Sequence, residues 1–278
     1  MTGPNPFTII HKDNSIIVVN KASGIAVTGE RWDSDAPRLD LLLRQELAAS
    51  MAEGRGSPSG ENPEPELFTV HRIDKDTSGL VIFARDRETH KRLSAAFENR
   101  AAEKTYIAVV HGRPSWPGGG ASCDLPLIPD GNKKHLTIVD KYRGKRSLTA
   151  FTLLFSAGNY SVVEARPETG RTHQIRVHLS CMGHPIVCDP LYGKHSRSGA
   201  EKGVCLSAFK RDWHGDPAEE RPLLARLGLH ALRLAIDDTR FEAPLPKDMA
   251  ALLKQMEKCG FTQSANQDVY PKQDLLNP

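Results

Sequence analysis

A polar run at residues 71–78 could carry chemistry, because it stands directly before an apolar stretch at 79–84 that predicts a buried strand. Loops at strand ends commonly carry sites, since a rigid element positions them. Asp74 offers a carboxylate, which can act as a covalent catalyst when it is ionised and aimed. Asp76 and Thr77 can also bond their own backbone, so this run taken alone favours a capped turn with surface charges.

A second candidate segment spans residues 166–179 and contains Arg171. Thr172 is a favourable N-cap for a helix ending at Gly183, although a strand over 171–179 is the alternative. The free N–H groups of a helix start favour an anion, and an arginine there could hold a carboxylate or a phosphate bidentately. A surface ion pair is the simpler interpretation of Arg171.

A basic run lies between these elements and contains a single acid, Asp140. The run is either a solvated face or a surface that binds an RNA phosphate backbone. Its members are Lys133, Lys134, Lys141, Arg143, Lys145 and Arg146. Net charge is +3 and adds little to this argument.

Composition limits the class of protein. A chain of 278 residues with 39% hydrophobic residues predicts one large domain, assigned to residues 1–260. The stretch at 52–66, rich in Gly, Pro, Ser and Glu, predicts a mobile insertion, and residues 261–278 predict a tail without fixed structure. No signal peptide or uncharged membrane span is recognisable, and five scattered cysteines suit a reducing compartment. We therefore expect a cytoplasmic protein that does not bind membranes.

The periodicity of apolar residues predicts both strands and helices. Strands are expected at 7–10, 15–19, 79–84, 105–110, 150–155, 160–165 and 229–236. Helices are expected at 39–51, from Asp86 as N-cap to about 99, from Thr172 to 183, and at 249–258.

Other chemistries fit the residues less well. His173 with His178, or Cys181 with Cys188, lack the spacing of a structural zinc site. The glycines at 118–120 are not followed by the Lys-Ser/Thr of a phosphate-binding loop, and no GxSxG elbow accompanies a hydrolytic triad. We expect neither a metal nor a cofactor.

Two long segments together resemble the RluA family of pseudouridine synthases. The family motif HRLDxxTSGL is matched at 71–80, with Ile73 in place of leucine, and TGRTHQIRVHL is matched letter for letter at 169–179. Similar segments occur at 104–112, 183–186, 189–193 and 229–231, and at 19–24 with Ala22 in place of proline. The resemblance covers residues 8–246; many members also carry an N-terminal S4 domain, which we do not expect here.

The resemblance implies roles for individual residues. Asp74 corresponds to the catalytic nucleophile, Arg171 to the arginine that pairs with it, and Tyr106 to the tyrosine that stacks on the target uracil. Arg72 matches the residue that fills the gap left by the flipped nucleotide. The further expected substrate-binding residues are His71, Thr77 and Ile175, with Lys133, Lys134, Arg143, Lys145 and Arg146 of the basic run.

The resemblance also implies a fold and a function. We expect an α+β domain with a long, mixed, largely antiparallel sheet, flanking helices and a central RNA-binding cleft. The expected activity is isomerisation of uridine to pseudouridine in ribosomal or transfer RNA by base flipping, without cofactor, by a monomer that needs no protein partner. The alternative is a catalytically silent RNA-binding or ribosome-assembly factor of the same fold. Retention of Asp74, Tyr106 and Arg171 argues against it, because an inactive descendant could lose them.

Overall fold

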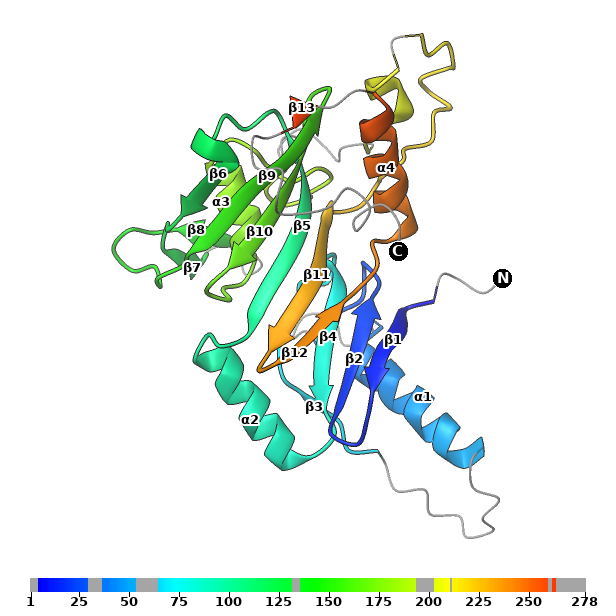
Figure 1. The fold of residues 1–278 in the computed structure, drawn as a ribbon, viewed down its shortest axis with the longest axis vertical. Coiled ribbons are helices and arrows are strands. Elements are labelled where there is room, and N and C mark those ends of the chain that lie inside the picture. The colour runs from blue at the N-terminus through cyan, green and yellow to red at the C-terminus, as the bar shows by residue number, and fades with distance from the viewer. Residues whose placement is uncertain are drawn as a thin grey trace. The chain divides into compact units, whose positions relative to one another are not determined.

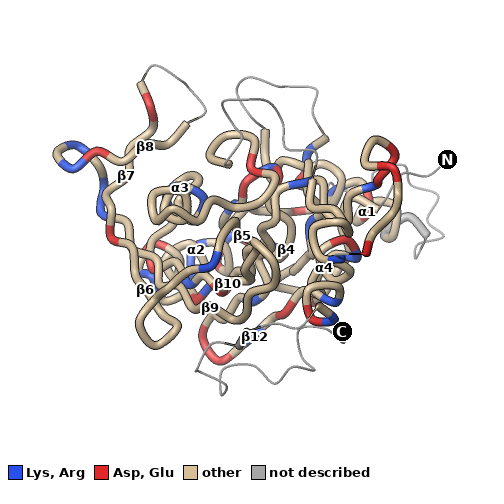
Figure 2. The backbone as a smooth tube through the Cα atoms, turned by 90° about the horizontal axis from the view of Figure 1, so that it is seen from above, with Lys and Arg blue, Asp and Glu red and all other residues tan. Residues whose placement is uncertain are grey.

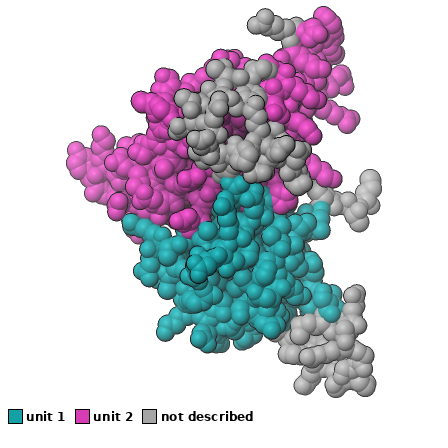
Figure 3. All heavy atoms as spheres, in the orientation of Figure 1, with its two compact units in different colours: residues 1–102, 233–243 teal, residues 103–232, 244–278 magenta. Residues whose placement is uncertain are grey.

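A computed structural model of the chain describes residues 5–29, 37–53, 65–131, 136–193, 203–210, 212–259 and 262–263; its elements are labelled in Figure 1. Contacts divide the chain into two units, which Figure 3 shows in different colours. Unit 1 comprises residues 1–102 and 233–243, and unit 2 comprises 103–232 and 244–278. Within the described segments, no helix is long and apolar enough to span a membrane.

Unit 1 is built around a strand that is buried along its whole length, β4 (Ser78–Ala84). Such a continuous apolar run is expected of a central strand. Its strands lie in the order β1 (Phe7–Lys12), β2 (Ile16–Lys21), β4 and the end of β11 (Leu229–Ile236), with β3 (Phe68–Thr69) beside β4 and β12 (Thr239–Glu242) beside β11. The helices of this unit are α1 (Leu39–Glu53) and α2 (Arg87–Glu98).

Unit 2 contains the start of β11 and a second set of strands. Their order is β11, β5 (Glu103–His111), β10 (Tyr160–Pro167), β9 (Thr149–Ala157) and β13 (Thr262–Gln263), with β6 (Gly120–Cys123) beside β9. A separate hairpin joins β7 (Leu127–Pro129) to β8 (Thr137–Val139). The helices are α3 (Gln174–Cys181), α4 (Lys247–Lys258) and the 3-10 turns η1 (Pro117–Gly119) and η2 (Leu206–Ala208).

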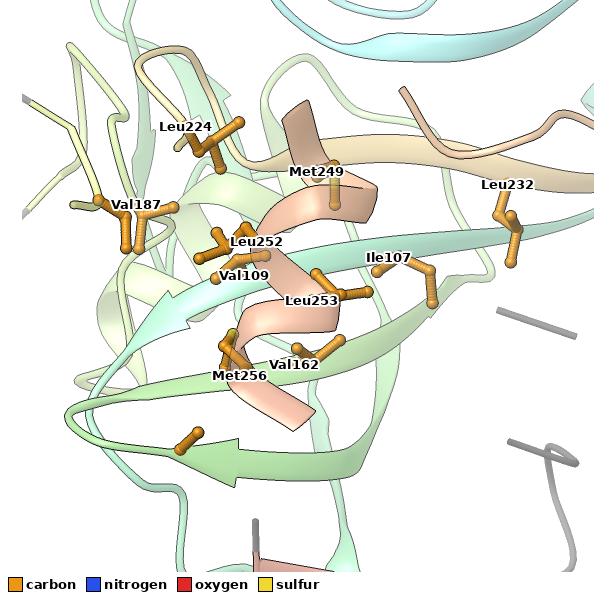
Figure 4. Packing of buried hydrophobic residues seen from close by; sticks show 12 residues of the cluster. Ile107, Val109, Val162, Val187, Leu224, Leu232, Met249, Leu252, Leu253 and Met256 are labelled. Atoms are coloured by element: carbon orange, nitrogen blue, oxygen red, sulfur yellow. The ribbon is translucent and has the colours of Figure 1, made fainter. Parts of the chain in front are cut away.

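The two faces of strand β5 pack against different helices, because side chains alternate along a strand. Ile107 and Val109 belong to a cluster with α4, whose buried residues recur at helical spacing (Figure 4). Ala108 and Val110 belong to a second cluster with Ile175 of α3, against which Tyr106 also packs. Tyr106 therefore lies on the α3 side of the sheet.

The expected α+β class with a large, largely antiparallel sheet is confirmed. The ladders β1–β2, β2–β4, β5–β10, β9–β10 and β11–β12 are all antiparallel. The predicted strand at 229–236 has the same bounds in β11, and Asp86 caps α2 by accepting from the Thr89 backbone N–H at 2.8 Å. The hairpin β9–β10 turns at 158–159, where Gly158 has a φ of 58°.

Three expectations need adjustment. Thr172 is not the N-cap of α3; the helix begins at Gln174, and its N-cap is His173, which has a left-handed φ of 56° and makes no side-chain cap. Strands β6, β7 and β8 were not predicted, because three or four residues give too little alternation to recognise. In the predicted tail, 262–263 form β13 beside β9, whereas 54–64 of the predicted insertion lie outside the described residues.

Candidate active site

Asp74 lies on a tight turn between β3 and β4 in unit 1. Its carbonyl oxygen accepts a hydrogen bond from the Thr77 backbone N–H at 3.1 Å, which closes the turn. Asp74 is half-buried, while Ile73 on one side and Thr77 and Ser78 on the other are buried. The chain is thus anchored on both sides of the carboxylate, as a residue that must be aimed requires.

The loop at residues 20–24 holds this turn through its backbone carbonyls. Lys75 O accepts from Lys21 Nζ at 2.9 Å and from the Gly24 N–H at 2.9 Å. Asp76 O accepts from Ser23 Oγ at 2.6 Å. We call these contacts of Lys21, Ser23 and Gly24 the carbonyl clamp. It fixes the backbone that follows Asp74 to the end of β2.

Lys21 is a residue that the sequence analysis did not single out. Its side chain is fully buried, and its ammonium also donates to Ala22 O at 2.9 Å. A lysine is almost never buried completely unless partners compensate its charge. The available signal was a charged residue placed at the end of the apolar stretch 15–19, where solvent would normally be expected.

The hydroxyl of Thr77 is buried and has no hydrogen-bond partner among the described residues. Buried hydroxyl groups normally have a hydrogen-bond partner, so the Thr77 hydroxyl is a candidate to bond a water molecule or a ligand. Thr77 Oγ1 belongs to the residue three positions after Asp74, on the same turn. The expected contact between Thr77 and the substrate stays a prediction.

His71 and Arg72 differ in their surroundings. His71 Nε2 accepts from the Ile82 backbone N–H at 3.1 Å, and its ring stacks on Phe97 with centroids 4.5 Å apart. The ring thereby attaches the Asp74 segment to β4 and α2, which favours a positioning role over direct contact with substrate. Arg72 is exposed, as a side chain that reaches into RNA must be.

Arg171 lies in unit 2, on a turn held by Gln174. Gln174 Oε1 accepts from the Arg171 N–H at 3.1 Å and from Thr169 Oγ1 at 2.7 Å. Gln174 Nε2 donates to Leu148 O at 3.0 Å and to Thr149 Oγ1 at 2.9 Å. The amide of Gln174 is therefore fully used in fixing the backbone of Arg171. The Arg171 side chain donates from Nε to Arg146 O at 3.3 Å.

Tyr106 and Ile175 are brought together within unit 2, since both pack in the cluster between β5 and α3. Lys104 lies two residues before Tyr106 and so faces the same side of β5. A side chain at Gly170 would reach within 4.0 Å of Lys104 Nζ, which places this ammonium beside the Arg171 turn. Burial lowers the pKa of Lys104. The sequence analysis assigned Lys104 no role of its own.

The described part of the basic run is exposed. Lys141, Lys145 and Arg146 reach solvent, and Figure 2 shows Lys and Arg along a loop beside β7 and β8. Arg143 Nε donates to Asp140 Oδ2 at 2.9 Å, and backbone and side-chain hydrogen bonds from Arg143 lower the pKa of Asp140. The ion pair with Asp140 therefore weakens the attraction of Arg143 for a phosphate. Lys133 and Lys134 lie outside the described residues.

His178, one of the histidines considered as a zinc ligand, has protein partners at both ring nitrogens. Nδ1 lies 3.0 Å from Thr149 Oγ1, and Nε2 lies 3.1 Å from Leu125 O. A carbonyl can only accept, so Nε2 carries the proton and Nδ1 accepts from the threonine. His178 is a hydrogen-bonded histidine of the protein interior.

The expected residues thus form two groups, each defined within its own unit. Asp74, Thr77 and His71 share the turn before β4, whereas Arg171, Tyr106 and Ile175 surround the start of α3. The pairing of Asp74 with Arg171 stays a prediction.

Comparison with known proteins identifies the family. The family model described as RNA pseudouridylate synthase matches residues 15–181. The chain is 34% identical over 259 residues to ribosomal large subunit pseudouridine synthase D of Zymomonas mobilis, covering 90% of this chain and 73% of that protein. An uncharacterised RNA pseudouridine synthase of the same species is 34% identical over 241 residues, covering 86% of this chain and 94% of that protein.

Solved structures show the same fold. Human RNA pseudouridylate synthase domain containing 4 superposes with a TM-score of 0.68 at 23% identity, over 92% of this chain and 94% of the human one. The chain therefore belongs to the RNA pseudouridylate synthase family and is an isomerase.

Proposed function

We propose that the protein converts specific uridines of large-subunit ribosomal RNA to pseudouridine, with Asp74 as the nucleophile. The named relative from Zymomonas mobilis supports this class of RNA. The observation that carries the assignment of Asp74 is the carbonyl clamp, which holds the turn bearing a half-buried carboxylate from both Lys75 O and Asp76 O. Transfer RNA is the second substrate class to be tested.

The reaction is an isomerisation, so every atom of the product comes from the uridine and water. The bond from N1 to C1′ breaks, the uracil turns over, and a bond from C5 to C1′ forms. Asp74 would bond to C1′ while the uracil is detached and leave when C5 attacks, which splits one difficult displacement into two. The hydrogen on C5 is lost as a proton, and N1 gains one.

Base flipping follows from this chemistry, because C5 and C1′ of a stacked nucleotide are inaccessible to a protein carboxylate. Tyr106 would stack on the extruded uracil, a contact worth about 1–3 kcal/mol per base. Arg72, which is exposed, would occupy the space that the nucleotide vacates.

We further propose that the protein acts as a cytoplasmic monomer. None of its five cysteines, all of which lie in described segments, forms a disulfide. Cysteines without disulfide bonds fit a reducing compartment.

The test uses RNA labelled with tritium at C5 of uridine, because conversion releases this tritium into water. Wild-type protein should release tritium from a large-subunit ribosomal transcript in a single turnover. Asp74→Asn keeps the shape but removes the charge, and it should release none while binding RNA within a few-fold of wild type. Asp76→Asn is the matched control, since Asp76 is also half-buried on this turn and its backbone oxygen stays in the clamp.

Two outcomes would contradict the proposal. Release by Asp74→Asn at the wild-type rate would remove Asp74 as the nucleophile. Wild-type protein that binds ribosomal and transfer RNA but releases tritium from neither would be a silent RNA-binding factor.

A further inference from the structure

Tyr192 connects three segments of unit 2 through one hydroxyl group. Its Oη accepts from the Thr137 backbone N–H of β8 at 2.7 Å and lies 2.9 Å from Nδ1 of His173. His173 is the left-handed N-cap of α3, two residues after Arg171. The hydroxyl thus joins the hairpin β7–β8 to the turn that carries Arg171.

A buried ion pair holds the tyrosine itself. Arg176 of α3 donates from Nε and Nη2 to the two carboxylate oxygens of Asp189, each at 2.8 Å, and both side chains are almost fully buried. Asp189 Oδ1 also accepts from the backbone N–H groups of Leu191 and Tyr192 at 2.9 and 3.0 Å. The guanidinium of Arg176 lies 5.2 Å from the centroid of the Tyr192 ring. The position of the ring is therefore set by α3.

Burial raises the pKa of Tyr192, so the phenol stays protonated and offers both a proton and lone pairs. Its Oη accepts from the Thr137 N–H, and in the bond to His173 Nδ1 the tautomer of the histidine decides which group donates. Tyr192→Phe removes both bonds while leaving the ring that packs on Arg176.

We propose that Tyr192 is a positioning residue for the reaction, and that its hydroxyl, acting through His173, fixes the turn that presents Arg171. This inference rests on the proposed function and on the expected pairing of Arg171 with Asp74. The turn is held by Gln174, by the bond from Arg171 Nε to Arg146 O and, through His173, by Tyr192, so loss of the Tyr192 hydroxyl removes one of these anchors.

The same hydroxyl relates this turn to the surface expected to bind RNA. Strand β8 lies within the sequence of the basic run, and Lys145 in that run exchanges two backbone hydrogen bonds with Leu127 of β7, at 2.8 and 3.0 Å. Arg171 Nε reaches the backbone of the same run at Arg146 O. The Tyr192 hydroxyl therefore links the basic run, which is expected to bind RNA, to the turn that carries Arg171.

The test compares variants in single-turnover conversion at saturating RNA, in RNA affinity and in melting temperature. Tyr192→Phe should slow the conversion by about ten- to a hundredfold, as small misplacements of catalytic groups do, with unchanged RNA affinity. Tyr160→Phe is the matched control, because Tyr160 belongs to the same unit but packs in the cluster with α4 rather than against α3. It should behave as wild type in all three measurements.

His173 provides the second pair of variants. Asparagine tolerates the left-handed conformation and offers a polar atom near the position of Nδ1, whereas leucine offers neither. His173→Asn should therefore retain more of the rate than His173→Leu. The double variant Tyr192→Phe with His173→Leu should be no slower than His173→Leu alone, because both remove the same contact.

An amide hydrogen-exchange measurement separates this inference from the proposed function. Exchange at Arg171 and Gln174 should rise in Tyr192→Phe relative to Tyr160→Phe, and this readout does not require turnover. Unchanged exchange together with a wild-type rate would overturn the role of Tyr192. Weaker RNA binding with an unchanged rate would also overturn it, since Tyr192 would then serve the RNA-binding loop alone. Wild-type protein that converts no uridine would instead refute the proposed function.

Discussion

At the scale of single residues, Lys21 shows how the protein holds the turn of Asp74 through backbone carbonyls. The fully buried ammonium bonds Lys75 O, next to the proposed nucleophile, and Ala22 O. A hydrogen bond to a charged group contributes about 1.5–3 kcal/mol to stability. The buried charge is thus offset by bonds that also define the turn.

Replacing Lys21 by methionine should remove one donor of the carbonyl clamp and loosen the turn that carries Asp74. Lys75 O would keep only the Gly24 N–H among the clamp donors described above, and the turn would gain freedom. We expect the single-turnover rate to fall by about tenfold or more, with RNA affinity unchanged, at temperatures well below the melting transition. The control is Lys12→Met, which replaces an exposed lysine at the end of β1. A folded Lys21→Met variant that reacts as fast as wild type would show that the clamp does not position Asp74.

His178 makes folding stability depend on pH. Burial lowers the pKa of His178 below its ordinary value of 6.5. The unfolded chain therefore binds the proton more tightly than the folded one, and stability rises with pH in this range. The stability present above pH 6.5 should be lost as the pH falls from 6.5 towards the folded-state pKa, at up to about 1.4 kcal/mol per pH step of one.

The measurement is the free energy of unfolding against pH for wild type, His178→Gln and His214→Gln, where His214 is an exposed histidine. His178→Gln should flatten the curve below pH 6.5, whereas His214→Gln should not. Parallel curves for all three proteins would mean that His178 does not carry this dependence.

At the residue scale, the sequence identifies the residues expected to do chemistry better than the residues that position them. Asp74 is identified through the family motif at 71–80, whereas the run taken alone favours a capped turn. Lys21, Gln174 and Tyr192 form hydrogen bonds with residues at positions 75, 148 and 173, and such distant partners leave no periodicity in the chain. The ring of His71 contacts Ile82 and Phe97, and its expected contact with the substrate stays a prediction.

At the scale of elements, the basic run is a surface loop whose residues differ in availability. Arg143 is paired with Asp140, whereas no acidic partner accompanies the exposed side chains of Lys141, Lys145 and Arg146 among the residues described. Contacts to phosphate release counterions, so each contributes to the salt dependence of RNA binding.

Neutralising these three residues together should test the surface. The variant Lys141→Gln, Lys145→Gln, Arg146→Gln should bind RNA more weakly, and the log–log salt slope should fall by nearly one for each lost contact. The matched control is Lys247→Gln, Lys254→Gln, Lys258→Gln on exposed positions of α4, which changes net charge equally. Equal slopes for the two triple variants would identify the run as a solvated face.

Long elements were predictable from the sequence, whereas the burial of helix α3 was not. Strand β11 and helix α4 have clear periodicity, and their predicted positions are confirmed. Helix α3 is buried on nearly all sides from Gln174 to Leu179, so it lacks an amphipathic pattern. Its start was placed too early because Thr172 is a better cap by residue type than His173.

At the scale of the whole molecule, the proposed site residues come from both units. Asp74 and its clamp belong to unit 1, and Arg171, Tyr106 and the basic run belong to unit 2. The chain passes between the units at residues 102–103, 232–233 and 243–244, and β11 contributes to both. Composition gives no sign of this division, since no linker-like stretch marks these boundaries. The assignment of residues 1–260 to one domain stays a prediction.

The central claim is that Asp74 isomerises uridine in large-subunit ribosomal RNA. It is tested most directly by mapping pseudouridines in ribosomal RNA from cells that lack the gene, complemented with wild-type protein or with Asp74→Asn. The account predicts that at least one ribosomal pseudouridine disappears on deletion, returns with wild-type protein and does not return with Asp74→Asn present at equal abundance. An unchanged ribosomal map on deletion, or full restoration by Asp74→Asn, would contradict it.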